Sequence, residues 1–341
     1  MLGVLLALQA ALVEPTASDP FAFFRPSVVI SADDRRRLDR GEPLARALPG
    51  EDREVAVFAA VPVDIDGDRL VAWMRRIAVL KKSPYVLAIG RFSDPPRLED
   101  LADLVLDDED LSEIRQCRPG ACGLKLARAE IDQLRSTAVE AGSAWKPALQ
   151  DGFRRIVLRR VQAYLEGGHA TLGHYENHDR PVSLAARFSL LLQHSAFLSE
   201  HLSQFTEYLD RYPHARMQGV ESMVYWSKER LGAKAIVSAT HVSIVRGTGE
   251  LLPDALVAGK GIFATHYVDG SLGITAIMRG EQGARHYLVY LNRSEIDAVR
   301  GFFGGVVRWF VERRLKAEAA DVLPELRRRL ESGEPPSLRQ P

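Results

Sequence analysis

Residues 255–278 read ALVAGKGIFATHYVDGSLGITAIM, and this stretch decides the fold prediction. A sheet with one face in water alternates apolar and polar residues along each strand, and this stretch does not. We predict strands over 255–268 and 271–279, and in both of them either face carries mostly apolar or small residues. The sequence therefore predicts a sheet that is covered on both sides.

One face of these two strands carries unusually small residues. Gly259 and Gly261 in the first strand alternate onto the same face, as do Ser271 and Gly273 in the second. Small residues leave room above the sheet, which either larger neighbours or a bound ligand must fill. We predict a ligand cavity here, with a solid core as the alternative.

More strands and one long helix surround this stretch. Strands are predicted over 220–230, 234–246 and 285–292, followed by a helix from about 296 to 330. Ser294 with Asp297 resembles a capping box at its start, and Pro324 is expected to bend it. One apolar stripe, suited to covering a sheet face, is formed by Leu315, Ala319, Val322, Leu326 and Leu330.

The first two thirds of the chain are predicted to be mixed. An irregular segment over 19–49 precedes a strand at 54–63, a helix capped by Asp66 or Asp68, and a strand at 85–92. Residues 98–126 are predicted to form two or three short strands with a helical turn. A sizeable helical insertion follows at about 127–212, with a break at 142–147, an irregular part at 169–181 and two helical pieces over 182–212.

The order of these elements resembles the START-like (SRPBCC, helix-grip) superfamily. Three segments carry the resemblance: EVAVFAAVPVDIDGDRLVAWM at 54–74, the stretch at 255–278, and GARHYLVYLNRSEIDAVRGFFGGVVRWFV at 283–311. The resemblance implies an α+β fold in which a curved antiparallel sheet wraps around the long C-terminal helix and encloses a hydrophobic cavity. It also implies binding of a lipid, sterol, polyketide or other apolar molecule. Because some members are enzymes, it does not decide whether a reaction is catalysed.

Charge and hydropathy narrow the classes of partner and the location. Lys plus Arg equals Asp plus Glu at 45 each, without the basic excess typical of nucleic-acid binders. Residues 1–13, MLGVLLALQAALV, are apolar but too short to span a bilayer, which predicts a signal peptide over 1–18 and a periplasmic or secreted protein. No Lys or Arg precedes this run, so a misplaced start codon or a buried helix are the alternatives. No later stretch predicts a transmembrane segment, and residues 19–341 are predicted to be a single domain.

The only two cysteines lie in the segment RQCRPGACGLKL. Pro119 and Gly120 stand between Cys117 and Cys122 and favour a turn that brings the two sulfurs together. We predict a disulfide in an oxidising compartment, with a reduced pair as the alternative. A structural zinc site wants four ligands, and a redox-active pair normally has the Cys-x-x-Cys spacing.

Candidate ligand-binding residues are aromatic or basic side chains on the predicted strands. Aromatic bodies with polar tips suit a pocket mouth and equally suit a sheet border, and a buried basic group is either paired or available to a ligand. Structural pairing with Asp269 or Glu229 is the alternative for the basic ones. The candidates are Tyr225, Trp226, His241, Arg246, Phe263, His266 and Tyr267.

A metal site is the alternative to a simple carrier. His169, His174 and His178 lie in the segment GGHATLGHYENHDR with Glu176 and Asp179, the densest set of metal-ligating residue types in the chain. We interpret them as exposed loop residues, with a zinc site as the alternative. Nucleophile, P-loop, dinucleotide and H-E-x-x-H signatures are absent from the sequence, so we assign no cofactor.

The sequence thus predicts an exported carrier for an apolar, lipid-like small molecule held between the sheet and the C-terminal helix. The alternative is an enzyme, either of the same fold or a zinc-dependent hydrolase that uses the His169–His178 loop.

Overall fold

The computed structural model describes residues 19–230, 233–249, 251–280, 285–297, 299 and 304–333. Within the last helix, side chains are described at 312, 313, 317 and 321–333. The predicted signal peptide and the side chains of Leu315 and Ala319 lie outside the described residues. Over the part that is described, no helix is long and apolar enough to cross a membrane.

The centre of the fold is an eight-stranded antiparallel sheet with the strand order β1-β2-β10-β9-β8-β7-β6-β3. The prediction of an α+β fold with a large antiparallel sheet is confirmed. The strands are β1 (Leu44–Leu48), β2 (Glu54–Val63), β3 (Val86–Arg91), β6 (Glu221–Glu229), β7 (Ile236–Arg246), β8 (Ala255–Ala264), β9 (Val268–Met278) and β10 (His286–Ile296). A separate two-stranded ribbon is formed by β4 (His174–Tyr175) and β5 (Val182–Ser183).

Helices fill the connections before β6 and follow β10. The α-helices are α1 (Ala32–Asp39), α2 (Gly67–Met74), α3 (Ile77–Leu80), α4 (Asp108–Gln116), α5 (Arg128–Glu140), α6 (Trp145–Gly167), α7 (Leu184–Gln193), α8 (Ala196–His201), α9 (Ser203–Arg211) and α10 (Gly304–Ser332). The 3₁₀ turns are η1 (Ala22–Phe24), η2 (Leu98–Leu101), η3 (Gly142–Ala144) and η4 (Gly168–Thr171).

The C-terminal strands follow the predicted pattern with two informative differences. β8 ends at Ala264 rather than at 268, because Tyr267 has a φ of 58°, outside the extended region. β10 continues to Ile296, where Ser294 pairs with Val55 and Ser271, so the predicted capping box was wrong. The Ser294 hydroxyl donates instead to Asn292 Oδ1 at 2.8 Å, and the long helix begins at Gly304.

Three predictions for the earlier part of the chain were also wrong. Residues 98–126 contain η2 and α4 rather than strands. The carboxylates of Asp108, Glu109 and Asp110 lie in the first turn of α4, where they interact favourably with the helix dipole. The segment 19–49 is not irregular throughout, because Ser31 and Asp34 form a capping box that starts α1, and β1 then adds an edge strand. Residues 182–212 form three helices rather than two.

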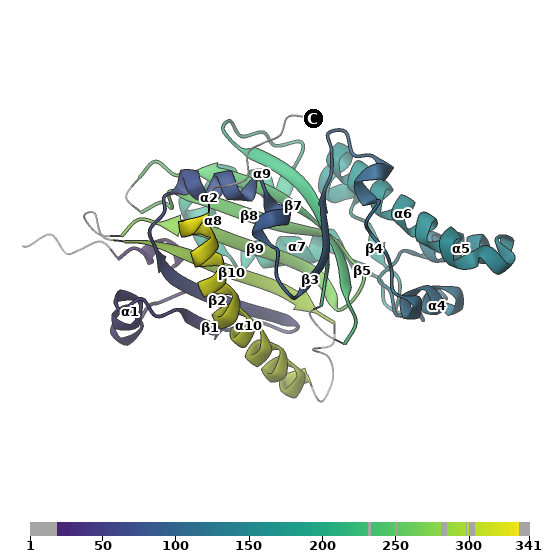
Figure 1. Cartoon of the computed structure of the whole chain (residues 1–341), viewed down its shortest axis with the longest axis horizontal. Coiled ribbons are helices and arrows are strands. Elements are labelled where there is room, and N and C mark those ends of the chain that lie inside the picture. The colour runs from purple at the N-terminus through teal and green to yellow at the C-terminus, as the bar shows by residue number, and fades with distance from the viewer. Residues whose placement is uncertain are drawn as a thin grey trace, which may run out of the picture.

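Two sets of helices lie on opposite faces of the sheet (Figure 1). We call the side that carries α2, α3 and α10 the α10 face, where α10 contacts β1, β2 and α2. We call the other side the α7 face. There η1, α7, α8 and α9 cover β2, β8, β9 and β10, while α6 with its neighbours covers the end formed by β6, β7 and β8.

Candidate ligand-binding site

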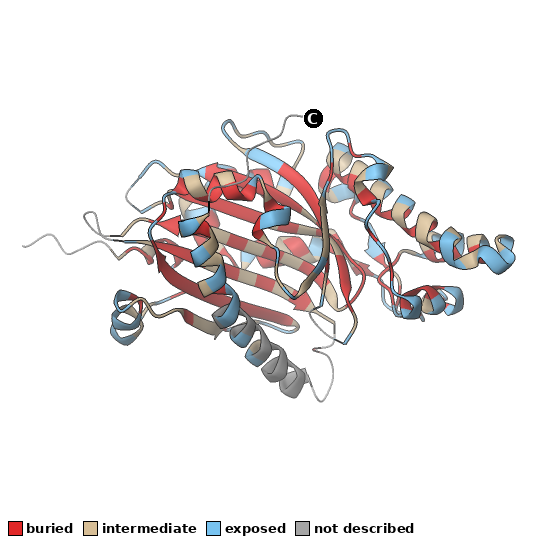
Figure 2. Ribbon diagram, viewed as in Figure 1, coloured by how far each residue is buried: buried red, intermediate tan, exposed pale blue. Residues whose placement is uncertain are grey.

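A band of small and polar residues runs across the middle of the α10 face. Strand pairing places Gly259 opposite Gly273, Thr275 opposite Tyr290, and Asn292 opposite Gly273. We call the six residues Thr240, Gly259, Gly273, Thr275, Tyr290 and Asn292 the polar band. All six are half-buried, and Figure 2 shows an intermediate band on the strands between α10 and β3.

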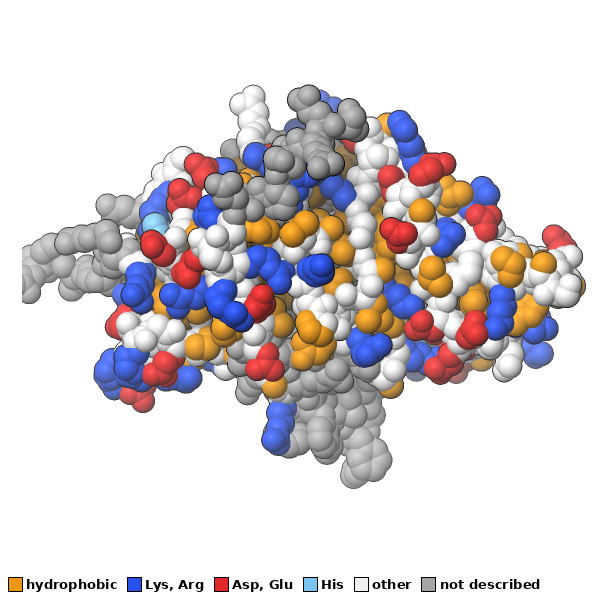
Figure 3. Space-filling view, in the orientation of Figure 1, with side chains coloured by type: hydrophobic (Ala, Val, Ile, Leu, Met, Phe, Trp, Pro, Cys, Tyr) orange, Lys and Arg blue, Asp and Glu red, His pale blue; other side chains and the backbone are white. Residues whose placement is uncertain are grey.

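Apolar side chains border the polar band on the same face. Val257, Ile277 and Leu288 are buried there and belong to the core beneath α2, α3 and the C-terminal part of α10, and Val57 is buried opposite Asn292. Figure 3 shows this side of the molecule, where hydrophobic side chains lie beside Lys and Arg side chains. The face therefore offers both an apolar surface and hydrogen-bonding groups.

Gly259 and Gly273 have no side chains, so nothing projects from the sheet at the middle of the polar band; we call these two residues its floor. A Cβ atom added to Gly273 would meet Asn292 Nδ2 at 3.6 Å, and one added to Gly259 would meet Thr240 Cγ2 at 3.4 Å and Gly273 O at 3.8 Å. These are ordinary van der Waals distances, so the described neighbours leave space for a larger side chain at either position. At Gly261, the other glycine of the predicted small face, a Cβ would clash with Ser271 Oγ, so no such space exists there.

A group of polar side chains closes one end of the polar band. The Lys81 ammonium, at the C-terminal end of α3, donates to Glu229 Oε1 at 2.6 Å and to Tyr225 Oη at 3.2 Å. Ser227 donates to the same Glu229 oxygen at 2.6 Å. We call Lys81, Tyr225, Ser227 and Glu229 the Lys81 corner. Burial disfavours the charge of Glu229, but Lys81 outweighs it and the pKa of Glu229 is lowered.

Tyr290 shares the electrostatic environment of the Lys81 corner. Burial raises the pKa of Tyr290 to about 12, while Lys81 lowers it and Tyr225 and Glu229 raise it. Three strands separate β10 from β6 in the sheet, yet their side chains influence one another over the α10 face. Tyr225 stands opposite Thr240 in the β6–β7 pairing, so the Lys81 corner adjoins the polar band. The Tyr290 hydroxyl stays protonated and able to donate at neutral pH.

Of the predicted ligand-binding residues, Tyr225 lies at this site. Trp226, His241 and Phe263 point to the α7 face instead. Trp226 donates to Asp100 O at 2.7 Å, His241 Nδ1 lies 2.9 Å from the Tyr164 hydroxyl, and Phe263 packs against Phe153. These three residues are buried among the chain's own side chains. Strand alternation turns Trp226 and His241 away from the polar band, and the register shift between Gly261 and Phe263 turns Phe263 to the same side.

The other predicted ligand-binding residues lie near strand ends. Arg246 forms an ion pair with Asp68, His266 lies between Asp110 Oδ1 and Gly123 O at 3.1 Å each, and the Tyr267 hydroxyl accepts from Lys234 N at 3.2 Å. The pairing expected with Asp269 or Glu229 was wrong. Asp269 pairs with Lys125 and Arg53, and Glu229 pairs with Lys81, because these cations reach the two carboxylates from outside the C-terminal strands.

The three histidines of the zinc alternative have different neighbours. His169 Nδ1 lies 3.5 Å from Asp210 Oδ1, His178 Nε2 lies 4.0 Å from Asp297 Oδ2, and His174 is exposed opposite Ser183. Across the described residues, no three His, Cys, Asp or Glu side chains are grouped in a way that would hold a metal ion. The zinc alternative therefore gains no geometric support.

The predicted disulfide joins Cys117 and Cys122. Gly120 has a φ of 82°, and Arg118 pairs with Ala121 inside the loop, so the turn expected from Pro119 and Gly120 is present. Ala121 also bridges to His178, which ties the turn to the loop before β5.

Sequence reasoning missed most of the polar residues of the site. Lys81 ends a short helix far away in sequence, and no local pattern signals that its ammonium reaches Glu229. Tyr290 and Asn292 lie in the predicted strand 285–292, but the sequence does not show which strands pair with it or which side chains lie beside theirs. The alternation of small residues at Gly259 and Gly273, and the aromatic body with a polar tip at Tyr225, were the usable signals.

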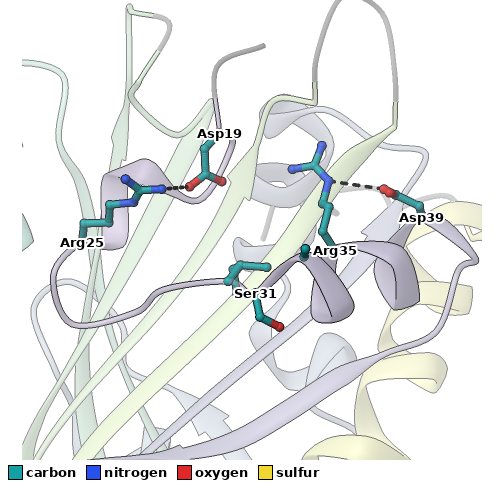
Figure 4. A pocket seen from close by; sticks show the side chains of 7 residues that line it. Asp19, Arg25, Ser31, Arg35 and Asp39 are labelled. Atoms are coloured by element: carbon teal, nitrogen blue, oxygen red, sulfur yellow. Dashed lines mark hydrogen bonds and ion pairs between the residues drawn. The ribbon is translucent and has the colours of Figure 1, made fainter. Parts of the chain in front are cut away.

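A hollow lies at the surface between η1 and α1 (Figure 4). Its volume is about 450 Å³, and its charged groups pair with one another: Arg25 with Asp19, and Arg35 with Asp39. An open, internally neutralised hollow of this kind offers a ligand little beyond what water offers. We therefore place the candidate site at the polar band.

Comparisons with known proteins add little. No family model matches the chain, and no curated protein matches it. The crystal structure of TTHA0849 from Thermus thermophilus is similar over 39% of this chain and 84% of that one, with 14% identity and a TM-score of 0.24. Similarity at that level supports no argument about fold or function, so the assignment depends on the site itself.

Proposed function

We propose that this protein is a carrier that holds a small, largely apolar molecule with a polar end between the α10 face of the sheet and α10. The observation that supports it most is the half-buried glycine floor of Gly259 and Gly273, bordered by buried apolar side chains. The Lys81 corner and Tyr290 would accommodate the polar end of the ligand. Small residues in the centre of a sheet leave room that larger neighbours or a ligand must fill, and we assign that room to a ligand.

The proposal includes the START-like arrangement. A run of antiparallel strands precedes a long C-terminal helix, and that helix contacts β1, β2 and α2 on the same face as the polar band. In such an arrangement the sheet curves around the helix and a ligand occupies the space between them.

We also propose that the carrier works outside the cytoplasm. The disulfide between Cys117 and Cys122 is compatible with an oxidising compartment. Secretion of the full-length chain by its own host, with loss of the first 18 residues, would test this part.

The direct test is to look for a bound molecule. Protein purified from its own host is analysed by native mass spectrometry, and then extracted with organic solvent. We expect a stoichiometric small molecule that leaves on extraction. A chain that carries nothing and binds no apolar probe would contradict the proposal.

A pair of glycine substitutions tests whether the ligand binds at the polar band. Gly273→Val fills the floor of the polar band with a residue that suits a strand, and we expect it to weaken binding of N-phenyl-1-naphthylamine, an uncharged fluorescent probe, by at least about tenfold. Gly249→Val is the matched control, since Gly249 lies in the exposed loop between β7 and β8, where a Cβ would meet only ordinary contacts to Leu252. Equal binding by both variants would show that the probe lies elsewhere.

A further inference from the structure

Directly behind the floor of the polar band, the α7 face carries a buried group of ionisable side chains. Lys260 on β8 and His241 on β7 are cross-strand partners, 1% and 2% exposed. His169 in η4 is close enough for the charge of Lys260 to act on its pKa, as it does on that of His241. We call Lys260, His241 and His169 the Lys260 cluster.

Asp210, 3.5 Å from His169, is the carboxylate that acts on the Lys260 cluster, and it forms no ion pair with Lys260. The Lys260 ammonium donates to Leu209 O at 3.1 Å and faces the rings of Phe188 and Tyr164 at 4.2 and 5.2 Å. Among the described residues, no carboxylate lies within ion-pair distance of Lys260. The other ionisable groups facing the cluster are Tyr164 from α6, and Tyr208, Asp210 and Tyr212 from α9 and the residue after it.

This environment keeps the cluster neutral. Burial lowers the pKa of Lys260 to about 7 and that of His241 to about 3. Burial also lowers the pKa of His169 to about 4. His241 Nε2 and His169 Nε2 are buried without a hydrogen-bond partner among the described residues. A proton added to Lys260 therefore places a charge beside one carbonyl acceptor, Leu209 O, with no carboxylate within ion-pair distance among the described residues, and local opening to water relieves it.

The sheet is weakly paired at the same place. Lys260 lies between Gly259 and Gly261, and His241 follows Thr240. Residues of the Lys260 cluster and residues of the polar band therefore alternate along the same short segments of β7 and β8. The β7–β8 register shifts between Ala239 and Thr240, and the pairing of β8 with β9 ends at Lys260 and Leu272. A bulge next to the end of a ladder is where a sheet opens at the least cost.

We propose that protonation of Lys260 loosens β8 at residues 256–264 and so releases the ligand from the polar band on the opposite side. This inference depends on the proposed function, because it describes how that same site is regulated. Ligand binds the closed, neutral form and protons bind the loosened form, so each lowers the affinity for the other. Acid is therefore the release signal.

The test measures N-phenyl-1-naphthylamine affinity between pH 8 and pH 5.5 in the full-length chain. We expect the wild-type affinity to fall at least about tenfold, within the usual range of coupling between sites. Lys260→Met, which keeps the length of the side chain and removes its charge, is expected to change less than about twofold over the same range. Lys228→Met is the matched control. It removes another buried lysine from the α7 side, one already paired with Asp107 at 2.6 Å, and is expected to keep the full pH dependence.

Hydrogen exchange separates failure of this inference from failure of the carrier proposal. Amides of residues 256–264 are expected to lose protection at pH 5.5 in wild type, after correction for intrinsic rates, and to keep it in Lys260→Met. A wild-type affinity that ignores pH, or a Lys260→Met variant as acid-sensitive as wild type, would overturn the inference. If no probe binds at any pH, the carrier proposal fails, and unchanged protection in acid would then overturn the acid-driven loosening as well.

Discussion

The two faces of the large sheet are built from the same strands but use them differently. On the α7 face, Phe58 is fully buried and packs edge-on against Phe21 and Phe24, with ring centroids 6.4 and 6.0 Å apart. On the α10 face, the centre of the sheet carries two opposed glycines and half-buried hydroxyl groups. The first face is filled by the chain, and the second carries small and half-buried residues at its middle.

This difference separates stability from ligand binding. Large buried side chains on the α7 face supply most of what a core contributes to the free energy of unfolding. Small residues on the α10 face contribute little, and their presence in the centre of a sheet is explained by what lies above them. The exception on the filled face is Lys260, whose burial acts against stability.

The largest expected effect comes from removing a large buried side chain from the α7 face. Phe58→Ala should lower the free energy of unfolding by about 3–5 kcal/mol, because it removes a ring enclosed by two others. Thr275→Ala, on the half-buried polar band, should change it by less than about 1 kcal/mol. Urea unfolding of both variants at pH 7.5 provides the measurement. Similar losses in the two variants would mean that the α10 face is as solid as the α7 face.

A pH-dependent effect follows from the lysine on the filled face. The pKa of Lys260 is about 7 in the folded state against 10.5 for an ordinary lysine, so between these values the unfolded chain binds the extra proton and stability rises with pH. Below pH 7 both states are protonated and the full cost applies.

Lys260→Met should therefore be more stable than wild type by about 3 kcal/mol at pH 6, with the difference shrinking toward pH 10. Unfolding curves at four or five pH values check this. A variant less stable than wild type at pH 6 would show that the ammonium has a partner that compensates its burial.

The smallest expected effect, on ligand binding, comes from comparing two tyrosines of one strand that point to opposite faces of the sheet. Tyr290 and Tyr287 both lie in β10, but Tyr290 faces the polar band and Tyr287 faces Asp39 on the other side, at 3.4 Å. Tyr290→Phe should weaken binding of 1-dodecanol, measured by displacement of the naphthylamine probe, about three- to tenfold through loss of one hydrogen bond. Tyr287→Phe should leave it unchanged. Equal effects would remove Tyr290 from the site.

Local patterns predicted much of the framework. The run of valine and alanine at 54–63 coincides with β2, and the last five strands were each found, with errors of up to four residues at their ends. The errors lie where a single residue controls the chain direction, as Tyr267 does with its positive φ. Short elements held by distant contacts, such as β1 beside β2, leave too little local signal to be found.

The sequence by itself determined that a sheet covered on both sides would form, that one face would carry small residues, and that the two cysteines would be brought together by a turn. These properties depend on side-chain alternation and turn chemistry over a few residues. Only the tertiary structure decided that Lys81, Tyr225 and Glu229 meet, and that Tyr290 shares their environment across three intervening strands. It also decided that Lys260 and His241 are buried behind the glycine floor. Strand order and helix docking set those contacts, and neither is encoded in any short stretch of residues.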